Sequence, residues 1–226
     1  SVPTPTAGPK VTLVAADFTP ATHAYNVTIE KFADLVKQYT GGQVEFKIYH
    51  AGALIKGTDM LDGVRKGLTD IGAITIAYFP GDLPFSASAG MIPFGWTYEG
   101  ARQIVPKLRP LFDEEFAKVN MKMLWAIPLA IEWMYTKPVD PANPSFAGMK
   151  IRTPGEPWTS VIKIFGGAPV SMASSEIPIA LTTGVVDGVA TSLQTYDGWD
   201  VYANAGYVTV TQGFINIGNP WTISLT

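Results

Sequence analysis

Residues 146–193 read FAGMKIRTPGEPWTSVIKIFGGAPVSMASSEIPIALTTGVVDGVATSL. Short apolar runs alternate in this stretch with segments whose apolar side chains recur at helical spacing. Gly166 and Gly184 end the two helical segments, as glycine often does at helix C-termini. The order strand, helix, strand, helix, strand predicts an α/β sheet with mainly parallel strands. The expected strands are 149–152, 169–172 and 185–191, and the expected helices are 158–165 and a helix from a cap at Ser174 or Ser175 to Gly184.

Two side chains of this stretch stand where a ligand is expected. In α/β sheets, ligands bind beyond the C-terminal ends of the strands, which here carry Arg152 and Thr191. The planar guanidinium of Arg152 suits bidentate pairing with a carboxylate. The alternative is that Arg152 forms an ion pair at the surface. Its position in the sequence, taken alone, favours this alternative.

The first half of the chain repeats the order of elements. Gly67 is followed by Asp70 at the third position and then by an apolar run toward a threonine, as Gly184 is followed by Asp187. This similarity by itself favours a turn that commonly joins a helix to a strand, rather than a repeated lobe. Because the preceding elements also correspond, two similar lobes facing each other across a cleft are the economical arrangement. The expected strands of the first half are 11–16, 43–49 and 70–77, and its helices are 24–39 and 58–68.

The remaining segments predict connections between the lobes. Residues 121–135 form a long extended candidate interrupted by Pro128, which suits a chain crossing from one lobe to the other. We expect an irregular stretch at 79–96, in which 91–94 form an apolar strand or wall. The other expected elements are a helix at 98–119 kinked or split at Pro106 and Pro110, a loop at 137–145, a helix at 195–203, and strands at 207–210 and 221–225. The expected division is 1–127 together with 214–226 in lobe I, and 128–213 in lobe II.

Composition narrows the function. The 226 residues are 47% apolar and 15% charged, and the net charge of −3 argues against a nucleic-acid partner. No apolar run approaches the roughly 20 residues of a membrane span. The absence of cysteine excludes disulfides and thiolate sites. His23 and His50 lack metal-ligand spacing, and we expect both at the surface or at a helix start. The small, Pro-rich opening resembles a secreted protein whose signal peptide has been removed.

Enzyme motifs are missing from the sequence. It contains no G-x-S-x-G elbow, no P-loop and no G-x-G-x-x-G. Paired carboxylates such as Glu114-Glu115 fall in helices expected to be exposed. We therefore expect no catalytic residues, no metal and no cofactor, although fold alone does not exclude a hydrolase or isomerase.

The run GMKIRTPGEPW, then GGAPVSM and ALTTGVVDG, resembles the core of the periplasmic solute-binding proteins of TRAP transporters, the DctP-type family. FADLVKQYTGG, VEFKIYHAGAL and MLDGVRKGLTDIGAI resemble the family's first half. The resemblance implies a two-lobed, periplasmic-binding-protein-like α/β fold with a ligand cleft between the lobes. It implies an organic acid whose carboxylate lies on Arg152. The family's long C-terminal helical region has no counterpart here, so we expect the chain to be truncated at its C-terminus.

Several positions depart from the family's pattern. Ile131-Glu132-Trp133 stands where sialic-acid binders carry a second arginine, and Ser174 replaces their phenylalanine. Val189-Ala190-Thr191 replaces a common Gln-Glu-Asn. We therefore expect a ligand other than sialic acid, either an acid with one carboxylate plus hydroxyls or an aromatic or amphipathic acid.

The candidate site residues differ in how firmly position alone supports them. Trp158 is equally a stacking platform and a buried helix residue. Glu132 is either an acceptor for ligand hydroxyls or an amine, or a solvated side chain. For Thr75, Tyr78, Asp17 and Phe18 the structural role is favoured over ligand contact. The complete expected ligand-binding set is Arg152, Trp158, Thr75, Tyr78, Thr191, Glu132, Trp133, Asp17, Phe18 and Ser174.

The resulting hypothesis is a periplasmic receptor that captures a small organic acid and delivers it to TRAP membrane permease subunits. An α/β enzyme, or a sensory ligand-binding module acting on a similar acid, is the alternative. Turnover of a sugar acid would favour the enzyme, and saturable binding without turnover would favour the receptor.

Overall fold

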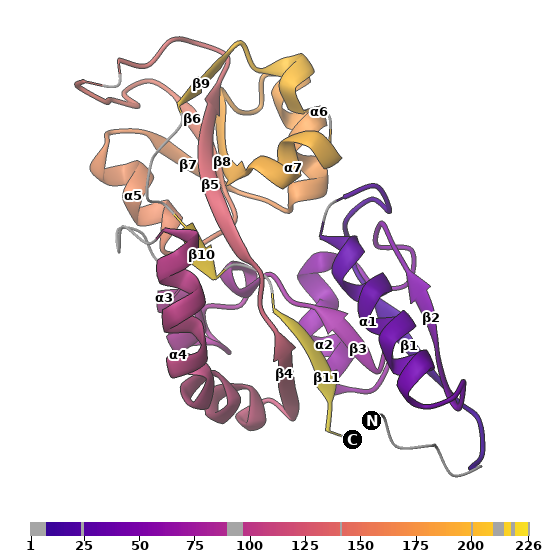
Figure 1. The fold of residues 1–226 in the computed structure, drawn as a ribbon. Coiled ribbons are helices and arrows are strands. Elements are labelled where there is room, and N and C mark those ends of the chain that lie inside the picture. Colours follow the sequence, from indigo (N-terminus) through magenta and orange to yellow (C-terminus); the bar gives the residue numbers. More distant parts are fainter. Residues whose placement is uncertain are drawn as a thin grey trace.

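The chain folds into two lobes, each built on one β-sheet, in a computed structural model (Figure 1). The structure describes residues 8–23, 25–89, 97–140, 142–199, 201–209, 215–217 and 220–225. The first sheet has the order β2-β1-β3-β11-β4, and the second has the order β10-β5-β8-β6-β7 with β9 paired to β5. The expected two-lobed α/β fold is confirmed.

The first lobe begins with alternating strands and helices. Its successive elements are β1 (Val11–Ala16), α1 (Asn26–Tyr39), β2 (Val44–Tyr49), η1 (Gly57–Asp59), α2 (Met60–Arg65), β3 (Ile71–Ala73), η2 (Ile76–Tyr78), α3 (Pro84–Ala89) and α4 (Tyr98–Lys118). Strand β1 lies at the centre of these and pairs in parallel with both β2 and β3.

The second lobe repeats this plan. Its elements are β6 (Lys150–Thr153), α5 (Trp158–Ile164), β7 (Ala168–Ser171), η3 (Ser174–Glu176), α6 (Ile177–Thr182), β8 (Gly188–Ser192), α7 (Leu193–Gly198), η4 (Val201–Asn204) and β9 (Tyr207–Thr209). Strand β6 is the central one and pairs in parallel with β7 and β8. The order β2-β1-β3 of the first sheet therefore corresponds to β7-β6-β8 of the second.

The strands that connect the lobes form antiparallel pairs with their neighbours in both sheets. β4 (Met121–Trp125) pairs with β11 (Trp221–Ser224) in the first sheet, and β5 (Pro128–Tyr135) pairs with β8 in the second. In Figure 1, β5 is the long strand that runs up from β4 into the other lobe. β10 (Ile215–Ile217) pairs with β5, and β11 returns to the first sheet beside β3. The expectation of mainly parallel order thus holds only within each repeated core.

The repeated aspartates have the same role in both lobes. A carboxylate oxygen of Asp70 accepts a hydrogen bond from the Val14 backbone N–H at 2.7 Å, and Asp187 accepts one from Lys150 N–H at 2.9 Å. The backbone N–H of each aspartate in turn donates to the same neighbouring residue, Val14 or Lys150. Each aspartate therefore locks the turn before its own strand onto the central strand of its lobe.

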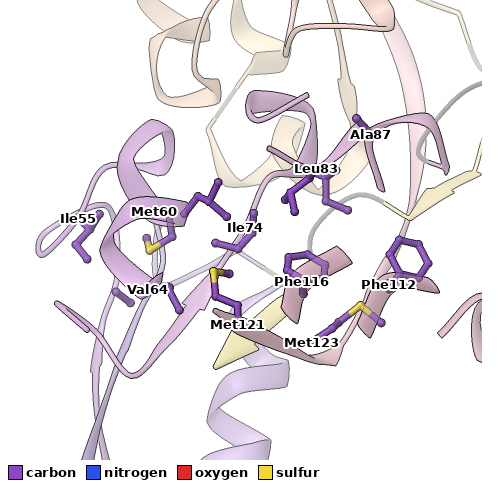
Figure 2. Close-up of a cluster of buried hydrophobic side chains, with 13 residues drawn as sticks. Ile55, Met60, Val64, Ile74, Leu83, Ala87, Phe112, Phe116, Met121 and Met123 are labelled. Carbon is purple, nitrogen blue, oxygen red and sulfur yellow. The ribbon is translucent and has the colours of Figure 1, made fainter. Parts of the chain in front are cut away.

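Hydrophobic clusters cover both faces of each sheet, because side chains alternate along a strand. In β5, Trp133 packs with α5 on one face and Met134 packs with α6 and α7 on the other. In β1, Ala15 and Ala16 divide in the same way between a cluster containing α1 and one containing α2 and α4. Figure 2 shows this last cluster, in which the phenylalanines of α4 and the methionines of β4 lie among side chains of α2 and β3–α3.

Several local details differ from the expected elements. β3 spans Ile71–Ala73 only, and the chain then turns into η2. Residues Pro84–Ala89 form helix α3 inside the segment expected to be irregular, while the wall expected at 91–94 lies outside the described residues. Helix α4 is not split at Pro106 or Pro110, which are four residues apart on its exposed side, where water can bond the carbonyl groups that they leave free.

We expect Asp70→Ala to lower the free energy of unfolding by about 1–3 kcal/mol, because it leaves the part-buried Val14 N–H without its acceptor. Urea unfolding measures this difference. Asp34→Ala, on the exposed face of α1, is the matched control and should change stability by less than about 0.5 kcal/mol. Equal effects of the two substitutions would contradict the role assigned to Asp70.

Candidate functional site

A cavity of about 60 Å³ lies where the two lobes meet. The first lobe contributes the loop after β1 and the segment after β3, and the second lobe contributes the ends of β6 and β8 and the segments that follow them. These are the C-terminal ends of the central parallel strands, where ligands bind in α/β sheets. Its lining residues are Phe18, Thr19, His23, Thr75, Ala77, Leu129, Arg152, Pro154, Trp158, Ser174, Ala190, Thr191, Ser192, Thr195 and Trp199.

Arg152 is the charged group of this cavity, and it is only 1% exposed. Its Nε and Nη2 donate to the Met172 carbonyl oxygen at 3.1 and 2.8 Å, and Nη1 donates to the Ala190 carbonyl oxygen at 3.1 Å. These carbonyl groups, one following β7 and one in β8, flank β6 and hold the guanidinium plane in one orientation. The arginine is thereby preorganised at the cavity rather than free to move.

No described carboxylate forms an ion pair with Arg152. Burial lowers the pKa of its guanidinium from the ordinary value, while the Tyr78 hydroxyl opposes that change. An arginine nevertheless stays protonated in proteins. The lobes therefore bury a positive charge whose hydrogen bonds in the described part of the chain all go to neutral acceptors, while the carboxylate of Glu176 favours the charge without forming an ion pair with it.

Tyr78 and Ser174 connect the lobes beside this charge. The Tyr78 hydroxyl accepts a hydrogen bond from Ser174 N–H at 2.9 Å and lies 3.2 Å from Ser174 Oγ. Arg152 Nη2 donates to both hydroxyl oxygens, at 3.4 Å to Tyr78 and 3.2 Å to Ser174. Tyr78 belongs to the first lobe and the other two residues to the second, so the guanidinium takes part in the contact between lobes.

Two glycines allow the lobes to approach closely. A Cβ atom at Gly155 would collide with the Ala77 carbonyl oxygen, and one at Gly198 would collide with the His23 ring. Gly155 and Gly198 lie in the second lobe, and their neighbours lie in the first. The structure is therefore a closed arrangement that depends on the missing side chains at these two positions.

Asp17 lies behind the cavity and orders the loop after β1. Its side chain is fully buried, accepts hydrogen bonds from the Thr19 N–H and hydroxyl at 2.6 and 2.7 Å, and lies 2.6 Å from His50 Nδ1. Burial raises the pKa of this carboxyl group, and the bonds to Thr19 and His50 oppose the rise. Asp17 thus holds Phe18 and Thr19 at the cavity wall.

The cavity brings together six of the ten residues expected at the ligand site. Tyr78 lies beside it through its bonds to Arg152 and Ser174. Trp133 lies in the core of the second lobe, stacked on Phe146, and Asp17 lies behind the wall. Glu132 pairs with Thr191 in the sheet, and its side chain lies outside the described residues. The six lining residues are Arg152, Trp158, Thr75, Thr191, Phe18 and Ser174.

Sequence reasoning missed His23, Thr19, Thr195 and Trp199 at the cavity. The sequence predicts His23 at the surface or at a helix start. The residue stands just before α1, where its carbonyl oxygen accepts a hydrogen bond from the Asn26 N–H at 2.9 Å, but it is only 4% exposed and packs against the second lobe. All four follow the C-terminal ends of β1 and β8 within a few residues. The rule that places ligands beyond strand ends would have found them, had it been extended to the segments after the strands.

The described residues contain no helix that is long and apolar enough to cross a membrane. They also contain no group of three or more His, Cys, Asp or Glu side chains arranged to hold a metal ion.

Comparison with known proteins gives one consistent result. The sequence pattern of the bacterial extracellular solute-binding proteins, family 7 (DctP), matches residues 15–223. A solute-binding protein of Albidiferax ferrireducens is 28% identical over 74% of this chain and 50% of its own length. The chain spans 35% to 59% of the length of three curated relatives that it matches.

Two solved structures share the fold. DctP7 of Bordetella pertussis, an extracytoplasmic solute receptor that binds pyroglutamic acid, has a TM-score of 0.87 at 21% identity, over 95% of this chain and 71% of that one. A TRAP periplasmic solute-binding protein of Rhodoferax ferrireducens with bound malonate has a TM-score of 0.84 at 24% identity, over 94% and 70%.

We expect Tyr78→Phe to lower the free energy of unfolding by about 1–2 kcal/mol, because the Ser174 N–H and Arg152 lose an acceptor between the lobes. Thermal and urea unfolding measure the loss. Tyr39→Phe, at a residue that is 54% exposed on α1, is the control and should leave stability unchanged. A Tyr78 variant as stable as the control would show that this contact contributes nothing.

Proposed function

Because the chain belongs to family 7 of the bacterial extracellular solute-binding proteins, we propose that it captures a small organic acid between its lobes. We further propose that it acts in the periplasm and delivers the acid to the membrane permease of a TRAP transporter. The family is the one that the motifs around Arg152 and Asp187 resemble. It is a family of receptors, which favours this function over the enzyme alternative.

The observation that carries the proposal is the buried guanidinium of Arg152 at the cavity. A buried charge without an opposite charge is unfavourable, and an anion that enters beside it relieves this cost. A carboxylate matches the planar fork of the guanidinium and forms charge-assisted hydrogen bonds with it. Arg152 would therefore supply a large share of the binding free energy.

The ligands of the related receptors agree with this chemistry. Pyroglutamic acid and malonate, found in the two similar structures, both carry a carboxylate. The two ligands differ in the rest of the molecule, so the carboxylate is the feature that they share. We propose that Trp158, Thr75, Thr191 and Phe18 shape the rest of the pocket in this chain.

The other expected site residues take supporting roles in the proposal. Tyr78 and Ser174 orient the guanidinium, and Asp17 positions the loop that carries Phe18. Glu132 remains a proposed acceptor for a ligand hydroxyl or amine. Trp133 acts indirectly, because it packs edge-on against Trp158, with the ring centroids 5.8 Å apart.

Capture would proceed by a shift of population between open and closed lobes. We propose that the lobes divide at 127/128, between β4 and β5, and at 213/214. A ligand that contacts both lobes favours the closed form, since its affinity for that form is greater. The closed form is then the one presented to the permease.

We expect Arg152→Ala to weaken the binding of carboxylate ligands about a hundredfold or more, because two charge-assisted hydrogen bonds are lost. Arg152→Lys keeps the charge and loses the fork, so it should weaken binding less. A thermal-shift screen against organic and sugar acids finds the ligand, since binding raises the melting temperature by mass action. Titration calorimetry then measures the affinities.

Arg102→Ala is the matched control, because Arg102 lies on α4 with its side chain 80% exposed. It should bind the same acid with unchanged affinity. If Arg152→Lys folds and binds as tightly as the control, Arg152 is not the anchor. Turnover of the acid by the wild type would instead favour the enzyme, and a gene neighbourhood that encodes no membrane permease subunits would favour a sensory module.

We expect Gly198→Ala to weaken ligand binding at least tenfold while leaving each lobe folded. Its Cβ would push the His23 ring away and hold the lobes apart, whereas alanine itself favours a helix over glycine. Small-angle scattering with and without ligand measures closure, and calorimetry measures affinity. Gly81→Ala is the control, since a Cβ there would meet no atom within 4 Å. Normal closure of the Gly198 variant would contradict the closed arrangement.

A further inference from the structure

Three buried polar atoms at the cavity have no hydrogen-bond partner. They are Nε2 of His23, Oγ1 of Thr75 and Nε1 of Trp199. His23 is 4% exposed and Thr75 is 9% exposed, so neither side chain is freely solvated. Buried polar groups are nearly always paired, and unpaired ones call for an explanation. Because all three residues line one cavity, the simplest explanation is that one bound group pairs with all three atoms.

The His23 ring lines this cavity and carries an unpaired donor. Its Nδ1 accepts a hydrogen bond from the Tyr25 N–H at 3.1 Å, so the proton of the neutral ring is on Nε2. Burial lowers the pKa of His23 to about 4, although Asp197 opposes the fall, and the ring is therefore neutral near pH 7. Nε2–H is thus an uncharged donor without an acceptor.

The other two groups add donors of the same kind. The indole Nε1–H of Trp199 only donates, and the Thr75 hydroxyl donates through its rotatable hydrogen. Trp199 belongs to the second lobe, whereas His23 and Thr75 belong to the first. The three residues therefore line one cavity only when the lobes are closed, as they are here with His23 against Gly198.

The charges around the cavity limit what these donors can bind. Arg152 is the sole cationic residue among the described lining residues, and none of those residues is a carboxylate. A second carboxylate on the ligand would lie without a cation of its own. An ammonium group would lie among donors, with no carboxylate among the described lining residues to pair with it. Both would be buried at a cost that a neutral acceptor avoids.

We propose that His23, Thr75 and Trp199 form an uncharged subsite for a carbonyl or similar neutral acceptor of a small monocarboxylic acid. The carboxylate of that acid lies on Arg152, so the inference rests on the proposed function and specifies its ligand class. The favoured ligands are oxo acids and lactam acids. Dicarboxylates, amino acids and plain alkanoates bind more weakly.

Pairs of acids that differ in one group test the subsite. Pyroglutamate is compared with cyclopentanecarboxylate, and 2-oxobutyrate with butyrate, by titration calorimetry on this chain. Proline and glutarate serve as the ammonium and dicarboxylate probes. In at least one pair the oxo or lactam acid should bind ten times or more as tightly as its partner, since the partner leaves buried donors unpaired. That acid should also bind more tightly than proline and glutarate.

Two substitutions remove the donors with little change in shape. Trp199→Phe deletes the indole N–H, and His23→Asn keeps an acceptor for the Tyr25 N–H but loses the unpaired Nε2–H donor. In both variants the affinity ratio within the discriminating pair should fall toward one. His23→Gln places an amide N–H near the position of Nε2 and should restore part of the ratio.

Trp221→Phe is the matched control, because Nε1 of Trp221 is also buried and unpaired but lies in the core of the first lobe, away from the cavity. In Trp221→Phe, the affinity ratio within the discriminating pair of acids should equal the ratio in the wild type. Equal affinities within both pairs, or a ratio that survives Trp199→Phe and His23→Asn, would overturn the subsite while Arg152-dependent binding remained. If neither Arg152→Lys nor Arg152→Ala lowers the affinity for the acid, the proposed function is wrong, and the proposed subsite is wrong with it.

Discussion

One guanidinium group is buried without an ion pair to any described carboxylate. The other features of the cavity depend on this constraint. Arg152 is only 1% exposed, and neutral carbonyl and hydroxyl oxygens hold it. The free energy that this burial costs is recovered when an anion enters. The same bonds that fix the arginine also join the lobes through Tyr78, so ligand charge and lobe closure are physically linked.

The repeated architecture explains why the charge stands at an interface between lobes. Each lobe orders its central parallel strand through one aspartate, Asp70 or Asp187, and directs the C-terminal ends of its strands toward the other lobe. Glycines at 155 and 198 remove the side chains that would keep the two edges apart. The cavity is consequently lined from both sides, which a single sheet could not achieve.

The lining of the cavity combines one charged side chain with several uncharged polar side chains. One end carries the fixed positive charge of Arg152, and His23, Thr75 and Trp199 supply neutral groups that lack partners. Such a division selects for ligands with one charge and one neutral acceptor, since an unpaired buried charge costs more than an unpaired buried dipole. Under the proposed function, the charge would decide that an acid binds, and the neutral groups would decide which acid binds.

The sequence by itself determined the layered α/β order, the repeat of Asp70 and Asp187, the family and the position of Arg152 at a strand end. These follow from apolar periodicity, glycine and proline positions, and short motifs, all of which are local. Only the tertiary structure decided that Trp133 packs in a core, that Pro106 and Pro110 are tolerated in one helix, and that His23 meets Gly198 and Trp199. These outcomes depend on contacts between residues far apart in the chain, and no local pattern records which distant side chains will be neighbours.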